Sequence, residues 1–176
     1  MLFAETSDDY GCWEWKGPVI RNQTTAYGKF FRRKAGFVSL SLLPDFLNYR
    51  REAYDIAVGS TEYNILEMIE CREGMTSTEL RKAIASGSGA RRHSMEGPLQ
   101  RLQMAGRLLI ADFEYKYTSK GERYGWGVAL YSTPEIWLGA HPAADRTPLE
   151  SFEFLVDSMA EKLPGADRKK IENLLR

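Results

Sequence analysis

The chain has 176 residues, of which 43% are hydrophobic and 27% charged, a composition typical of a globular domain that buries its own core. Lys plus Arg and Asp plus Glu both number 24, so any affinity for nucleic acid must come from a local patch. No stretch is apolar enough to span a membrane, and Cys12 and Cys71 lack disulfide or zinc spacing. The first residues have neither a basic start nor a long apolar run, so we expect no signal peptide. We therefore expect a cytoplasmic protein with packed, reduced thiols and no bound metal, and we expect His93 and His141 at the surface.

The first of three expected segments, residues 1–58, is an aromatic and basic extension. The run "AYGKFFRRKAGFVSLSLLPDFLNYRR" predicts a strand, a tight turn, a second strand and a helix with Pro44 in its first turn. The preceding "GCWEWKGPVI" predicts a short strand or loop packed on this hairpin.

The second segment, residues 59–140, carries the strongest periodic signal. It predicts three helices: one capped by Thr61, one opened by a capping box from Thr76 to Glu79, and one with the inward stripe Met95, Leu99 and Leu102 that Gly106 ends. Two alternating strands follow, joined by the turn "TSKGE". Three helices followed by a two-stranded hairpin is the order of a winged helix. The predicted fold class is therefore α+β: a winged helix, comprising three helices and a two-stranded wing, with an N-terminal β-hairpin and helix extension and C-terminal helices.

The third segment, residues 141–176, predicts two helices separated by Pro164 and Gly165. Each helix has an apolar face. These faces either pad the domain or form the interface of a homodimer.

The words "WEWK", "YGK" and "SLSLLP", followed later by "LQRLQMAGRLLI", resemble the AlkZ-related winged-helix family over about residues 12–132. This resemblance implies a winged-helix fold and distant kinship with the AlkZ/YcaQ DNA glycosylases, which unhook interstrand crosslinks. Those enzymes use a Gln-x-Gln or Gln-x-Asp pair, whereas this chain has only Gln23, Gln100 and Gln103. No catalytic residue is carried over.

The polar face of the third helix predicts contact with duplex DNA, because Arg and Gln side chains make bidentate bonds to guanine and adenine. Seven basic and four acidic residues between 91 and 126 leave a net charge of plus three, which is modest, and Glu96 would oppose phosphates. The predicted contacts are Arg91, Arg92, Gln100, Arg101, Gln103 and Arg107 on the helix, Lys120 and Arg123 at the wing, and Arg32 and Arg33 in the first hairpin. If that hairpin shares a face with the third helix, the two patches would form one groove.

Other interpretations stay open. Each basic set is also compatible with a solvated surface. A protein-interaction or dimerisation module fits the neutral net charge and the apolar C-terminal helices, and a DNA-repair enzyme with a different site is a further alternative. The sequence has no glycine-rich phosphate loop, no metal-ligand cluster and no Ser or Cys with a His partner by motif. We therefore expect a non-enzymatic DNA-binding protein without cofactors.

Overall fold

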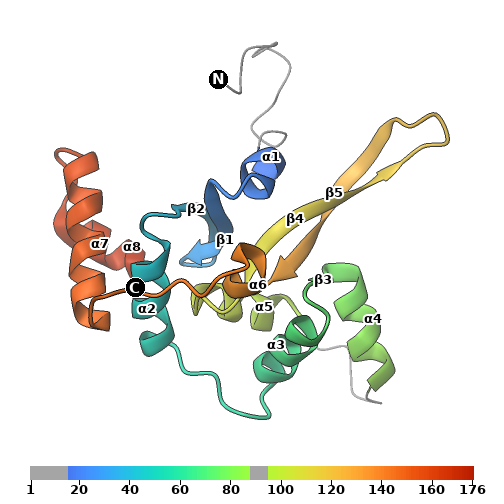
Figure 1. The fold of residues 1–176 in the computed structure, drawn as a ribbon, viewed down its shortest axis with the longest axis horizontal. Coiled ribbons are helices and arrows are strands. Elements are labelled where there is room, and N and C mark those ends of the chain that lie inside the picture. The colour runs from blue at the N-terminus through green and yellow to red at the C-terminus, as the bar shows by residue number, and fades with distance from the viewer. Residues whose placement is uncertain (1–15, 88–94) are drawn as a thin grey trace.

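The computed structural model describes residues 16–87 and 95–176, which form a mixed α+β fold with two small antiparallel sheets (Figure 1). In chain order the elements of these residues are α1 (Lys16–Arg21), β1 (Thr25–Phe31), β2 (Lys34–Ser39), α2 (Leu43–Ala53), α3 (Thr61–Cys71), β3 (Met75–Thr76), α4 (Ser77–Gly87), α5 (Glu96–Met104), β4 (Leu109–Tyr117), β5 (Arg123–Ser132), α6 (Pro134–Leu138), α7 (Pro148–Lys162) and α8 (Arg168–Leu175).

The N-terminal hairpin and its helix are confirmed. β1 and β2 pair antiparallel with Phe31 opposite Lys34, and α2 follows with its proline in the first turn. The expectation of a strand or loop before the hairpin is wrong for Lys16–Arg21, which form α1. Pro18 lies in the first turn of this helix, where its missing N–H costs no hydrogen bond. The fully buried Ile20 anchors α1 in a small cluster with Tyr27 and Ile110.

The three helices and two strands of the middle segment occur where the periodicity predicts them. The capping box is confirmed, because Glu79 accepts the N–H of Thr76 at 2.8 Å while the Thr76 hydroxyl accepts the N–H of Glu79 at 3.2 Å. The cap of α3 is Ser60 rather than Thr61, since the Ser60 hydroxyl accepts the N–H of Tyr63. Gly106 follows the end of α5 with a φ of 65°, as expected of a glycine after a helix.

The sheet of the middle segment has three strands in the order β3-β5-β4. β3 is only two residues long, too short to produce a periodic signal, and it pairs with β5 through Met75 opposite Tyr131. The hairpin β4–β5 extends well beyond the body of the protein (Figure 1).

The first and third segments of the chain share one core. Its buried members come from β1, β2, α2, the start of β4, α7 and α8: Ala26, Phe30, Val38, Leu43, Phe46, Leu47, Leu109, Phe152, Leu155, Val156, Ile171 and Leu175. The two predicted C-terminal helices are confirmed as α7 and α8, and most of their apolar faces pad this core. Leu163 and Leu174 remain 51% and 38% exposed.

A second core lies among α3, α4, α5 and the adjoining sheet. Its buried residues are Ile65, Ile69, Met75, Leu80, Leu99, Leu102 and Leu108. Cys71, expected as a packed thiol, is instead exposed, because it lies at the end of α3 outside this core. His141 is exposed as expected, whereas Cys12 and His93 lie outside the described residues. No helix within residues 16–87 and 95–176 is long and apolar enough to cross a membrane.

Candidate nucleic-acid interface

α5 packs against neighbours on two sides. Leu99 and Leu102 bury one side in the second core, and β1 of the N-terminal hairpin contacts another. What remains accessible is a narrow surface, called the α5 strip below, that consists of Glu96, Gly97, Pro98, Gln100, Arg101 and Met104. Of the third-helix residues predicted to contact DNA that the structure describes, only Gln100 and Arg101 lie on it.

Gln103 is not on the accessible face, and the prediction that it points outward is wrong. Its side chain is 1% exposed. The amide oxygen accepts the N–H of Lys29 in β1 at 2.9 Å, and the amide nitrogen donates to the carbonyl of Leu99 at 2.9 Å. The polar pattern of α5 marks a face turned away from the second core, but β1 covers part of that face. Gln103 therefore joins α5 to the hairpin.

The charges of the α5 strip are compensated within the protein. Arg101 forms an ion pair with the largely buried carboxylate of Glu62 in α3. Glu96 lies 3.0 Å from the ammonium of Lys29 and also accepts a hydrogen bond from Gln100 at 3.0 Å. The hydrogen bond and charge of Lys29 hold the pKa of Glu96 below its usual value. The strip itself therefore contributes little net positive potential.

Arg107 also departs from the predicted outward face of the third helix. The left-handed Gly106 turns the chain, so that Arg107 lies beyond the helix end with its N–H bonded to the carbonyl of Leu102 at 2.9 Å. Its partly buried side chain lines a hollow of about 380 Å³ together with Arg51 and Glu135. The guanidinium of Arg51 and the carboxylate of Glu135 form an ion pair at 2.7 Å. Burial, and then the charge of Arg51, lowers the pKa of Arg107.

The distal part of the β4–β5 hairpin carries accessible cations. Lys116 and Lys120 are exposed, and neither forms an ion pair with another described residue. Arg123 begins β5 opposite Tyr117 of β4. Arg91 and Arg92, predicted at the start of the third helix, lie outside the described residues.

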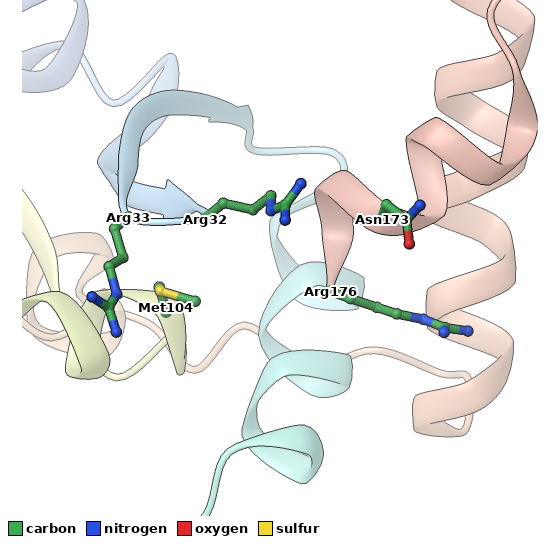
Figure 2. A pocket seen from close by; sticks show the side chains of 5 residues that line it. All are labelled: Arg32, Arg33, Met104, Asn173 and Arg176. Carbon is green, nitrogen blue, oxygen red and sulfur yellow. The ribbon is translucent and has the colours of Figure 1, made fainter.

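The turn between β1 and β2 places Arg32 and Arg33 beside the end of α5. Both are exposed, and they line a hollow of about 360 Å³ together with Met104 of α5 and with Asn173 and Arg176 from the end of α8 (Figure 2). We call this the β1–α8 hollow. The first hairpin and the third helix, which the sequence left as separate patches, thus meet here. Arg176 is a third cation that sequence reasoning missed, because nothing local links it to a turn 143 residues earlier.

Two charged side chains inside the protein also escaped prediction. Arg50 is fully buried and donates to the carbonyl of Phe30 at 3.0 Å, and its guanidinium lies 5.3 Å from the ring centre of Phe46. Burial lowers the pKa of Arg50, although nearby tyrosines oppose this effect. Asp45 is 5% exposed and accepts hydrogen bonds from Ser151 at 2.8 Å and from Arg146. The pattern "PDFLNYRR" distinguishes neither residue from its solvent-facing neighbours.

The model of the AlkZ-related family matches residues 2–176, so the chain belongs to that family over nearly its whole length. The match reaches well beyond the residues on which the sequence resemblance rests. Comparisons with curated proteins and with solved structures found no match.

Proposed function

We propose that residues 60–132 are a winged helix that binds duplex DNA through the α5 strip and the β4–β5 hairpin. The order α3, β3, α4, α5, β4, β5, with a sheet ordered β3-β5-β4, supports the fold. It supplies three helices, a short strand after the first helix, and a hairpin that follows the third helix directly. In winged helices that bind DNA, the third helix enters the major groove and the hairpin contacts the backbone.

The observation that carries the binding proposal is the distribution of uncompensated cations around α5. The strip pairs its own charges, while Lys116 and Lys120 on one flank and Arg32 and Arg33 on the other have no ion pair within the described residues. Phosphate contacts position a protein on DNA, and contacts to base edges select sequence. The proposed division is that the flanks hold the backbone and that Gln100, with Arg101 beside it, faces the base edges.

This division revises the predicted contact set. Gln103 and Arg107 leave it, because both take part in contacts inside the protein. The proposal is a binding protein rather than an enzyme, since the chain lacks the Gln pair that the resemblance associates with glycosylase activity. Within residues 16–87 and 95–176, no group of His, Cys, Asp and Glu is arranged to hold a metal ion.

The decisive experiment is a salt titration of binding to a fluorescent duplex, followed by anisotropy. We expect the dissociation constant to rise steeply between about 50 and 200 mM salt, as for other backbone contacts. Lys116→Glu with Lys120→Glu is expected to weaken binding, whereas Lys162→Glu with Lys170→Glu, an equal charge change on exposed residues of α7 and α8, is expected to leave it nearly unchanged. Absence of duplex affinity in the unmodified chain at low salt would contradict the proposal.

The alternative of a dimerisation module has one supporting observation, the partial exposure of Leu163 and Leu174 outside the shared core. Light scattering after size exclusion tests it directly. A dimer that Leu163→Asp with Leu174→Asp converts to a monomer, in a chain without duplex affinity, would favour this alternative over DNA binding.

A further inference from the structure

The turn between β1 and β2 has a backbone conformation that arginine residues rarely adopt, yet both of its residues are arginines. Arg32 and Arg33 are the two residues between the paired Phe31 and Lys34, and their φ angles are 50° and 65°. Positive φ at both central positions is the requirement of a type I′ turn, for which Asn-Gly and Asp-Gly are the favoured pairs. A residue with a β-carbon is strained in this region, and such strain often accompanies a functional role of the side chain.

Neither of the two arginines forms an ion pair with another described residue. Figure 2 shows Arg33 directed toward the end of α5 at Met104, and Arg32 directed toward α8. The lining of the β1–α8 hollow has three arginines and no acidic residue. The carbonyl oxygen of Arg176 accepts the hydroxyl hydrogen of Tyr54 at 2.9 Å, so this acceptor is already used by α2. Three guanidinium groups from two segments of the chain, with that of Arg176 lying 5.7 Å from the ring centre of Phe152, are thus available to an anion.

We propose that Arg32, Arg33 and Arg176 bind successive phosphates of a nucleic-acid backbone, on the side of α5 where α8 lies. This inference rests on the proposed function and extends its footprint, because the β4–β5 hairpin extends on the other side of α5 (Figure 1). Arginine matches phosphate because its planar N–H donors bind two oxygens at once. The divergence of Arg32 and Arg33 favours a chain of phosphates over one small anion, which would need converging donors.

The test replaces the two arginines with the pair that the turn prefers. In R32N/R33G the backbone strain is relieved, so the melting temperature is expected to stay equal or rise while two cations disappear. We expect the duplex dissociation constant at 100 mM salt to increase roughly 10- to 100-fold, and the slope of log K against log salt to decrease in magnitude by about 2. R176A should lower that slope by about 1 more. K162A/K170A removes the same charge from exposed residues outside the hollow and should change neither quantity appreciably.

The outcomes separate this inference from the proposed function. Equal duplex affinity and equal salt slope in R32N/R33G and the unmodified chain would overturn the inference and leave DNA binding through α5 and the β4–β5 hairpin intact. If the unmodified chain binds no duplex, the proposed function fails, and tripolyphosphate then serves as the probe. A rise in melting temperature with tripolyphosphate that R32N/R33G lacks would still support phosphate binding at this turn, whereas no such rise would overturn it.

Discussion

The two β-hairpins of the chain both end in basic turns, yet the protein supports them differently. β1–β2 is packed on both α5 and α2, with Ala26 and Phe30 fully or almost fully buried. The distal half of β4–β5 extends away from the body, and its Tyr117 and Tyr124 are 61% and 50% exposed. The first hairpin, β1–β2, therefore presents its arginines from strands that are packed on the body of the protein, and we call it the packed hairpin. The distal half of β4–β5 presents its lysines from strands that project into solvent, and we call it the projecting hairpin.

This difference separates stability from binding. A substitution in the body of β1–β2 disturbs the core that it shares with α2, α7 and α8, so a loss of binding there does not by itself identify a contact. A substitution near the tip of β4–β5 removes little buried surface, and its effect on binding is direct. The turn residues Arg32 and Arg33 combine both properties, because an exposed side chain is held there by a buried strand.

The largest expected effect on stability comes from shortening a buried side chain of the packed hairpin. Phe30 is 1% exposed and its ring centre lies 5.2 Å from that of Phe46. Phe30→Ala is expected to lower the free energy of unfolding by about 3–5 kcal/mol, because it leaves a cavity in the shared core. Tyr117→Ala on the projecting hairpin should change the free energy of unfolding by less than about 0.5 kcal/mol. Urea denaturation measures the free energy of unfolding of both variants, and similar losses of stability would refute the contrast between the packed and the projecting hairpin.

The next effect tests how the end of β1 is held. Arg50→Met keeps much of the side-chain length but removes the donor to the carbonyl of Phe30, and the loss of this buried hydrogen bond is expected to cost about 1.5–3 kcal/mol. Lys170→Met, at an exposed position of α8, should cost less than about 0.5 kcal/mol. The measurement is again the free energy of unfolding in urea. An unchanged value for Arg50→Met would mean that packing among the aromatic rings, rather than this hydrogen bond, retains the arginine.

The sequence predicts those parts of the fold whose signals are local. The capping box of Thr76 and Glu79, the stripe of Leu99 and Leu102, and the polar turn that begins at Arg32 each lie within a few residues of the chain, although β2 already starts at Lys34. Burial of Gln103 depends on β1, some 74 residues away, so its polar character alone suggests a solvent-facing position. The same holds for the site, because the meeting of Arg32 with α8 is created only by the core that the two ends of the chain share.

Gln103 and Gln100 provide the third test, since they lie on one helix with different roles. Gln103→Ala leaves the N–H of Lys29 without its acceptor inside the protein and is expected to cost about 1–3 kcal/mol of unfolding free energy. Gln100→Ala, on the α5 strip, should cost less than about 0.5 kcal/mol. Duplex affinity measured by anisotropy is expected to fall for Gln100→Ala under conditions where both variants are folded. A larger loss of affinity for Gln103→Ala than for Gln100→Ala would contradict the assignment of the two roles.

The smallest expected effect on stability concerns the ion pair of Lys29 and Glu96, which joins the packed hairpin to α5. Because Lys29 lowers the pKa of Glu96 in the folded chain, the carboxylate contributes stability above its usual pKa of 4.5 and loses that contribution as the pH falls through the lower folded value. Glu96→Gln should therefore unfold slightly more easily than the unmodified chain at pH 7, and the difference should vanish in acid. Urea denaturation at several pH values follows this change, and a difference that grows as the pH falls would contradict the sign.

The same substitution acts oppositely on binding. Glu96→Gln removes a negative charge from the α5 strip and releases the ammonium of Lys29 from its partner 3.0 Å away. If the strip faces phosphates, duplex affinity at pH 7 is expected to rise by up to about tenfold, with a steeper dependence on salt. A variant that is slightly less stable yet binds DNA more tightly is not explained by damage to the fold. An unchanged or lower affinity would place the DNA away from the α5 strip. The projecting hairpin and the turn between β1 and β2 would then have to bind the DNA without α5.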